Sequence, residues 1–368
     1  MAGLSKRLGF ALEYSLGHIT HAQNLKRTLE SRADISPTYV DLPYDGMTGA
    51  WTKLPGVRSN WTLRASLGAW LGLRRQAKSL DGALFHTQVT SLFASGIMRR
   101  VPSVVSLDAT PLQYDALGAF YGHVPSSNSR LEEVKKRLNQ KSFNSARRLV
   151  TWSQWAKDSL VADYGVQSEK ITVIPPGIDT PRWAVDRSVA PNPGRPVNLL
   201  FVGGDFPRKG GDTLLRAFDS LPTSVNIHLN IVTKTADILI SDPSRISVWR
   251  DIGPNSPQLM KLFAEADLFV FPTRGDCLPL AVLEAMASGL PVVTTRVGAL
   301  PEAVTHGETG WIVPPDDSAA LVEALRLLVD DAPLRRQMGT NAREVASERF
   351  DADRNYRRLV EIVAGAGD

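Results

Sequence analysis

Short apolar runs alternate with helical patterns along most of the 368-residue chain. Runs rich in valine, isoleucine and leucine predict buried strands, and the segments between them carry apolar residues at helical spacing. Strands are expected at Leu8–Leu12, Ala83–Phe85, Ser103–Leu107, Arg148–Thr151, Ile171–Ile174, Val197–Val202, Asn226–Val232, Leu268–Phe271 and Pro291–Thr294. Strands that alternate with helices predict parallel sheets built from βαβ units.

The segment 186–196, rich in proline and small residues, divides this alternation into near-equal halves. It predicts a linker between two Rossmann-like, doubly wound α/β domains at 1–185 and 197–345. A last helix in 346–368 is expected to pack back on the N-terminal domain. Ligands of such sheets bind at the carboxyl ends of the strands, so we expect an interdomain cleft to hold the site.

The most informative segment of the chain contains two acids separated by seven residues, Asp276 and Glu284. Asp276 follows a predicted strand in a turn-rich loop, and Glu284 lies inside a predicted helix over 280–288. The first backbone N–H groups of a helix lack internal partners and, with the helix dipole, favour a phosphate. Two acids beside a phosphate site suit a ligand that carries both phosphates and hydroxyls, such as a nucleotide sugar.

A glycine-rich loop follows the first predicted strand of the second half. It begins at Gly203 and Gly204, presents Arg208 and Lys209, and leads into a helix. Glycines allow close approach of the backbone to a ligand, and two adjacent cations can neutralise a diphosphate. Taken alone, the two cations could equally lie in a solvated surface loop.

These features together resemble the retaining glycosyltransferases of family 4, which have the GT-B fold. The matching segments are Phe201–Gly204 with Arg208–Gly210, the Asp276/Glu284 segment, Val297–Val304 with Gly307–Val313, and Lys170–Asp179. The match is strong over about residues 140–350 and weak in the front third. The pattern is specific for the family but not for a substrate.

The resemblance implies a role for each matching position. Arg208 and Lys209 would bind the donor diphosphate and stabilise it as the leaving group, Glu284 would bind the ribose, and Asp276 would contact the transferred sugar. The remaining positions implied in donor binding are Gly17, Gly203, Gly204, Cys277, Leu278, Pro279, Leu280 and Ala281. Two departures put the sugar preference in question, because Asp276 replaces a glutamate and Cys277–Pro279 replaces the usual Gly-Phe-Gly.

In the first half the resemblance points to strand ends. Asp108 stands near the position of a family histidine and is expected to act in catalysis, by binding a sugar hydroxyl or a developing positive charge. His86, His18 and Ser153 are candidates for acceptor or sugar contact. For His18 the alternative is an ordinary surface or cap residue, and for Ser153 it is a helix N-cap.

Charge is distributed unevenly along the chain. The net charge is +4, with +9 in residues 1–187 and −5 in the remainder. A basic front half favours an anionic partner, such as a membrane surface or a charged acceptor. The segment Trp61–Lys78 combines tryptophans, leucines and basic residues, which suits either a membrane interface or a core helix with a wet basic face. With no spanning segment expected and a single cysteine, Cys277, we expect a cytoplasmic protein, peripheral at the membrane in one reading.

The expected function is therefore transfer of a hexose, with retention, from a UDP- or GDP-linked donor to a glycan, lipid-linked or small-molecule acceptor. No metal and no other cofactor is expected. A sugar-nucleotide phosphorylase or disaccharide synthase is the alternative within enzymes, and a non-catalytic nucleotide-sugar binder or partner subunit is the alternative outside them. Nucleic-acid binding is disfavoured, because the basic residues are scattered and no recognition module is evident.

Overall fold

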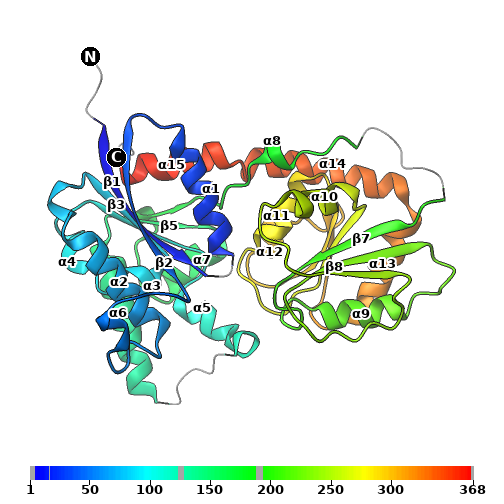
Figure 1. Cartoon of the computed structure of the whole chain (residues 1–368), viewed down its shortest axis with the longest axis horizontal. Coiled ribbons are helices and arrows are strands. Elements are labelled where there is room, and N and C mark those ends of the chain that lie inside the picture. Colours follow the sequence, from blue (N-terminus) through cyan, green and yellow to red (C-terminus); the bar gives the residue numbers. More distant parts are fainter. Residues whose placement is uncertain (1–4, 16, 123–127, 188–193, 366–368) are drawn as a thin grey trace. The chain divides into compact units, whose positions relative to one another are not determined.

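The computed structural model describes residues 5–15, 17–122, 128–187 and 194–365 (Figure 1). The chain forms two compact units, one made of 1–177 with 352–368 and the other of 178–351. The segment 186–196, expected as a linker, thus falls within the range of the second unit, and its residues 188–193 lie outside the described residues. The ends of the second unit are joined to each other, because Ile178 and Asp351 form a β-bridge and Thr180 Oγ1 donates to Asp351 Oδ2 (3.0 Å).

The first unit is built on a six-stranded sheet of order β2-β1-β3-β4-β5-β6, in which every pairing is parallel. Its strands are β1 (Lys6–Tyr14), β2 (Ile35–Pro43), β3 (Gly82–His86), β4 (Ser103–Leu107), β5 (Arg148–Thr151) and β6 (Ile171–Val173). The apolar pattern did not predict β2. This strand lies at the edge of the sheet, where prolines such as Pro37 and Pro43 are tolerated and little of the strand is buried.

Successive residues of these strands point to opposite faces, and each face is covered by helices. On one face, Phe85 and Val105 pack with Leu73 and Phe143 from helices α2 and α6. On the other, Phe10 and the strand residues beside it pack with α1 and α15. The helices of this unit are α1 (His18–Glu30), α2 (Trp61–Arg74), α3 (Gln88–Ser91), α4 (Ser95–Met98), α5 (Pro111–Ala116), α6 (Ser129–Ser145), α7 (Gln154–Ala162) and α15 (Ala352–Val363), with short 3₁₀ turns at Ala50–Lys53, Ala77–Ser79, Gly118–Tyr121 and Ser168–Lys170.

The second unit repeats the plan with a parallel sheet of order β12-β11-β10-β7-β8-β9. Its strands are β7 (Val197–Val202), β8 (Ile227–Val232), β9 (Ile246–Trp249), β10 (Leu268–Phe271), β11 (Val292–Thr295) and β12 (Gly310–Val313). Its helices are α8 (Thr180–Trp183), α9 (Gly211–Asp219), α10 (Pro257–Glu265), α11 (Leu280–Ala287), α12 (Leu300–Ala303), α13 (Ser318–Asp330) and α14 (Ala332–Arg349). The two strands that the apolar pattern did not predict, β9 and β12, are both edge strands. The two α/β sheets confirm the expected fold class.

The segment Trp61–Lys78 is not one continuous helix, because α2 ends at Arg74. Its Ala65, Ala69 and Leu73 are buried, and the last two belong to the core of the first unit. The Arg74 guanidinium lies over the Trp70 ring at 4.4 Å, so part of the basic and aromatic character is satisfied within the helix. In the part of the chain that the structure describes, no helix has the length and apolarity needed to cross a membrane.

Candidate functional site

The loop after β7 and the loop after β10 meet at a buried ion cluster in the second unit. Lys209 Nζ donates to Asp276 Oδ1, and Arg208 Nη1 lies 3.3 Å from the same oxygen and 2.7 Å from the Gly275 carbonyl oxygen. Thr273 Oγ1 donates to Asp276 Oδ2 at 2.6 Å. Arg208 and Lys209 were predicted from one segment of the sequence and Asp276 from another. In the structure the three residues form one hydrogen-bonded group.

Glycines permit this close approach of the two loops. Gly210 has φ +75°, and a Cβ there would lie 1.9 Å from the carbonyl oxygen of Pro272. A Cβ on Gly203 would lie 2.9 Å from the Lys209 side chain. Larger residues would push the cation loop away from Asp276, which explains why glycine occupies these positions.

Burial controls the electrostatics of this cluster. It lowers the pKa of Lys209, an effect that the Asp276 carboxylate opposes and the Arg208 charge reinforces. Arg208 and Asp276 are also buried, whereas Asp205, which accepts from Arg208 Nε at 3.0 Å, is 47% exposed. Buried Arg208 and partly buried Lys209 thus share the buried Asp276 carboxylate, while Arg208 also pairs with Asp205. Because water screens the exposed Asp205, the two cations are only partly neutralised, which favours an anion.

Glu284 lies one turn inside α11, the helix that follows Asp276. Its side chain is buried, and burial raises its pKa from 4.5 to about 7. Within the described residues its carboxylate forms no hydrogen bond. The helix begins after Pro279 without a side-chain cap, so the N–H groups of Leu280 and Ala281 have no cap either. A buried carboxylate without donors and an uncapped helix start are therefore on the same short helix.

Three predicted residues of the first unit come together at the carboxyl ends of its strands. His18 Nδ1 lies 3.1 Å from His86 Nε2, and His18 Nε2 lies 3.6 Å from Asp108 Oδ2. Asp108 Oδ1 also accepts from the Ala109 backbone N–H at 3.0 Å. His18 starts α1, His86 ends β3 and Asp108 follows β4, so the parallel topology brings together residues that are far apart in sequence.

Behind His18 the site consists of stacked rings. His86 stacks on His21 with ring centroids 4.2 Å apart and on Trp152 at 5.5 Å. Burial, followed by the charge of His18, lowers the pKa of His21 to about 3. Burial, with smaller contributions from His21 and His18, places the pKa of His86 well below 6.5. Two of the three imidazoles are therefore neutral at pH 7.

The other predicted positions differ in what they contact within their own unit. Ser153 Oγ accepts a hydrogen bond from the Ala156 backbone N–H at 3.1 Å, so Ser153 is the N-cap of α7, which is the alternative role given above. Gly17 precedes α1, and no atom lies within 4 Å of a Cβ built on it. Cys277 and Leu278 are buried in the loop before α11.

The sequence interpretation missed Glu13, a buried acid near the end of β1. Its carboxylate accepts hydrogen bonds from Trp61 Nε1 (3.0 Å), Thr87 Oγ1 (2.5 Å) and Ser15 Oγ (2.5 Å). The available signal was an acid placed directly after the buried run Leu8–Leu12. Asp205 and Thr273, the further partners of the ion cluster, were also missed. No set of three or more His, Cys, Asp or Glu side chains in the described ranges is arranged to hold a metal ion.

Two family models match the chain in its two halves. The model described as "Glycosyltransferase Family 4" matches residues 17–182, and the one described as "Glycosyl transferases group 1" matches residues 196–331. A similar curated protein is the MMP alpha-(1->4)-mannosyltransferase of Mycolicibacterium hassiacum, 33% identical over 215 residues. That match covers 55% of this chain and 50% of the relative. The chain spans about half the length of that relative.

Solved structures show the same fold over nearly the whole chain. Sucrose-phosphate synthase from Thermosynechococcus elongatus gives a TM-score of 0.76 at 17% identity, covering 98% of this chain and 99% of the other. The Anabaena protein Alr3699/HepE, in complex with UDP and glucose, gives a TM-score of 0.66 at 17% identity, covering 97% and 98%. The architecture is therefore GT-B, as expected.

Proposed function

Since the chain belongs to glycosyltransferase family 4, we propose that it transfers a hexose from a nucleotide-diphosphate sugar to an acceptor hydroxyl. The observation that carries this proposal is the second-unit site, where buried Arg208 and partly buried Lys209 share the Asp276 carboxylate beside an uncapped helix that holds the buried Glu284. The cations suit a diphosphate, and the carboxylate without donors suits a pair of hydroxyls.

In this proposal the second unit binds the donor. Lys209 and Arg208 neutralise the diphosphate, whose negative charge grows as the bond to the sugar breaks. Glu284 accepts hydrogen bonds from ribose hydroxyls, which replace the solvation that it lost on burial. The complex of the Anabaena neighbour with UDP and glucose supports a donor of this class.

Asp276 receives a role that differs from its expected one. It is hydrogen-bonded to both cations and to Thr273, so we propose that it positions them for the diphosphate before the sugar arrives. Its second role, contact with the transferred sugar, stays a prediction from the family resemblance.

The first unit supplies the acceptor and sugar side. Asp108 and His18 form a carboxylate–imidazole pair, and His86 contacts the other nitrogen of His18. Such a pair can bind sugar hydroxyls and hold a charge that develops on the sugar ring. We propose retention at the anomeric carbon, with the leaving phosphate accepting the proton of the attacking hydroxyl and without a catalytic metal.

Two finer proposals concern location and the alternative function. Because the front half of the chain is basic, we propose peripheral contact with an anionic membrane. A non-catalytic nucleotide-sugar binder remains the alternative from another class, because Asp108 and Asp276 both replace the usual family residues. Hydrolysis of the donor without acceptor separates the enzyme from the binder.

A thermal-shift screen of UDP- and GDP-linked hexoses, without added metal, tests the proposal directly. We expect one donor to raise the melting temperature of the wild-type chain and to lose that effect in Glu284→Ala. The exposed acid Glu265, replaced by alanine, serves as the matched control and should keep the shift. If a folded wild-type protein responds to none of the donors, the donor site proposed here is wrong.

A further inference from the structure

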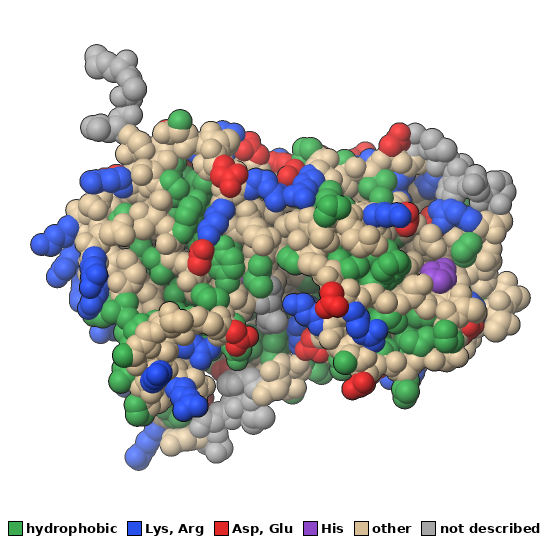
Figure 2. All heavy atoms as spheres, viewed as in Figure 1, with side chains coloured by type: hydrophobic (Ala, Val, Ile, Leu, Met, Phe, Trp, Pro, Cys, Tyr) green, Lys and Arg blue, Asp and Glu red, His purple; other side chains and the backbone are tan. Residues whose placement is uncertain are grey.

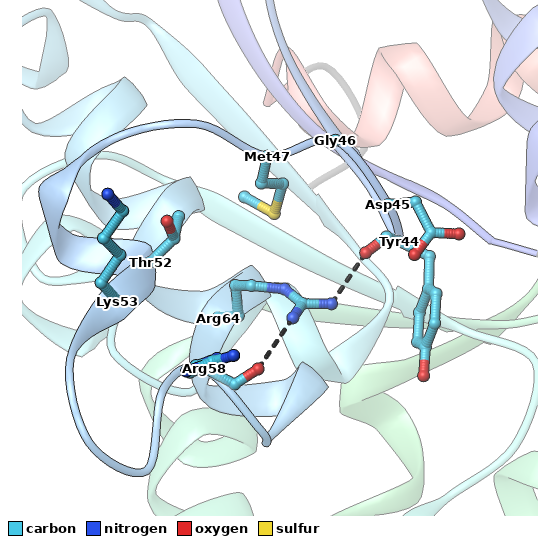
Figure 3. Close-up of a pocket in the computed structure, with 8 residues that line it drawn as sticks. All are labelled: Tyr44, Asp45, Gly46, Met47, Thr52, Lys53, Arg58 and Arg64. Carbon is cyan, nitrogen blue, oxygen red and sulfur yellow. Dashed lines mark hydrogen bonds between the residues drawn. The ribbon is translucent and has the colours of Figure 1, made fainter.

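A pocket of about 250 Å³ opens in the first unit between the end of β2 and the start of α2 (Figure 3). Its lining includes Tyr44 and Met47 from the segment after β2, Lys53 and Arg58 from the segment that follows, and Arg64 from α2. All of these residues belong to one compact unit and are described by the structure. The pocket is separate from the donor site of the second unit.

The lining carries more positive than negative charge. Lys53, Arg58 and Arg64 are cationic, and Asp45 is the one acid among the lining residues. In the described parts of the chain, none of the three cations forms an ion pair. On the face seen in Figure 2, Lys and Arg side chains also outnumber Asp and Glu over the part of the molecule that forms the first unit. Unpaired cations around a concave surface favour an anion.

Arg64 is held in place before any ligand arrives. Its Nη1 donates to the Arg58 carbonyl oxygen at 3.1 Å and its Nη2 to the Tyr44 carbonyl oxygen at 2.7 Å, as the dashed lines in Figure 3 show. Its guanidinium lies 5.6 Å from the Tyr44 ring and 5.3 Å from the Trp61 ring. Its Nε is sheltered from solvent and has no hydrogen-bond partner among the described residues. The guanidinium is therefore fixed before a ligand arrives, and each Nη carries a second N–H beyond the one that it donates to a carbonyl oxygen.

Hydrogen bonds connect the wall of this pocket with the strand-end site of the same unit. Trp61, one turn before Arg64 on α2, donates to Glu13 Oε1 at 3.0 Å. The other oxygen of Glu13 accepts from Thr87 Oγ1, and Thr87 directly follows His86. The helix that carries Arg64 is therefore hydrogen-bonded, through Trp61 and Glu13, to the residue next to His86.

We propose that this pocket binds a phosphate group carried by the acceptor, an inference that rests on the proposed glycosyl transfer. Its volume is slightly below the roughly 300–1,000 Å³ of drug-sized ligand sites, so it suits one charged group with part of a sugar or polyol ring. Three cations against one acid match a phosphate dianion better than a single carboxylate. The acceptor class is thus a phosphorylated sugar, polyol or lipid headgroup.

Titration calorimetry at low ionic strength tests the proposal with inorganic phosphate and glucose 1-phosphate. The titrations use the full chain with Lys209→Ala, so that phosphate binding at the donor site does not contribute. Adding Arg58→Ala or Lys53→Ala should weaken binding about tenfold each, the loss expected for one charge-assisted hydrogen bond. Arg75→Ala, which removes an exposed cation of the same unit outside the pocket, should change affinity less than about twofold. Neutral glucose should give no heat.

Three results overturn or delimit the assignment. Equal affinities in the Arg58→Ala and Arg75→Ala chains, or no phosphate binding at all, would overturn the pocket. With Lys209 intact, the thermal shift caused by the donor should persist in Arg58→Ala. If wild type shows no donor shift but its phosphate binding still depends on Arg58, the proposed function is wrong and the phosphate pocket is retained. Co-sedimentation with phosphatidylcholine vesicles that contain phosphatidic acid shows which molecule carries the phosphate. If the protein sediments with the vesicles, and Arg58→Ala abolishes this binding while Arg75→Ala preserves it, the phosphate belongs to a lipid. If the protein does not sediment with them, the phosphate belongs to a soluble acceptor.

Discussion

The two sheets have the same parallel construction but carry different chemistry at their carboxyl edges. In the second unit, buried Arg208 and partly buried Lys209 share the carboxylate of Asp276. In the first unit, His21 and His86 are stacked, buried and neutral, and only the outer His18 approaches a carboxylate. The topology therefore supplies an edge on which ligands can bind, and the loops decide which ligand. A charged cluster suits a diphosphate, whereas neutral rings suit sugar hydroxyls and the faces of sugar rings.

The largest expected effect breaks the charged side of this comparison. Lys209→Ala should lower kcat/KM roughly 30- to 1,000-fold, which corresponds to a loss of about 2–4 kcal/mol of transition-state stabilisation. The reason is that the lost charge acts on a leaving group that becomes more negative in the transition state. Steady-state kinetics with the donor found in the screen measure it. Most of the loss should appear in kcat.

Lys261→Ala is the matched control for that substitution. Lys261 lies on α10 in the same unit, is 64% exposed and pairs with Glu265 at 3.7 Å. Its removal deletes the same charge from the exposed surface and should leave kcat unchanged. Equal turnover in Lys209→Ala and Lys261→Ala would show that the ion cluster is structural.

The sequence was more informative for the charged edge than for the neutral one, and the reason is chain separation. Arg208 and Lys209 lie in one short loop, and Asp276 and Glu284 lie in one loop and its helix, so two local segments contain nearly all of that site. The first-unit group comes from five separate segments: His18 and His21 on α1, and His86, Asp108, Trp152 and Tyr356 on one segment each. Only the three-dimensional order of the strands brings them together, and no local pattern encodes that order.

Pairing was harder to predict than position, even at the charged edge. The sequence gives no sign that the carboxylate of Asp276 accepts hydrogen bonds from Lys209 and Thr273. A single acid at a strand end is common, so the sequence alone does not assign a role to Glu13. The three hydrogen bonds that its carboxylate accepts show that it organises the site. The edge strands β2, β9 and β12 were missed for a related reason, since half-exposed strands lack a continuous apolar run.

A second prediction uses pH to test the buried acid of the charged edge. Because the pKa of Glu284 is raised from 4.5 to about 7, the folded chain holds a proton over that interval that the unfolded chain has lost. This contribution to stability is fully present below pH 4.5 and is lost as pH rises through 7, about 2–3 kcal/mol between pH 5 and 8. Glu284→Gln should remove that slope in urea unfolding.

The same variant should lose donor affinity while gaining stability at pH 8. A ribose hydroxyl binds a carboxylate more strongly than an amide, so wild-type affinity for the donor should increase as pH rises through about 7 and the variant should stay weak. A variant that becomes more stable and still binds donor like wild type would separate burial of Glu284 from any role in binding.

The smallest expected effect concerns the neutral edge, where the stability contributed by His21 should depend on pH with the opposite sign to that contributed by Glu284. The pKa of His21 falls from 6.5 to about 3 in the folded chain, so the unfolded chain binds a proton first as pH decreases. The contribution to stability is present above pH 6.5 and is lost toward pH 3, about 2 kcal/mol of it by pH 5. His21→Phe should remove this acid loss. The OH of Tyr356, which lies 3.1 Å from His21 Nδ1, keeps its hydrogen bond to the Gly177 carbonyl oxygen.

Urea unfolding at pH 5 and pH 7 measures this difference, with the exposed His306→Phe as the control that should retain the wild-type change. His86 is buried against His21 and also loses stability on acidification, so His21→Phe should reduce the acid loss without abolishing it. If His21→Phe and wild type lose the same free energy between pH 7 and 5, the imidazole of His21 is not held neutral. The contrast between a charged and a neutral edge would then fail at its most buried residue, because a protonated His21 would give the first unit a buried cation of its own.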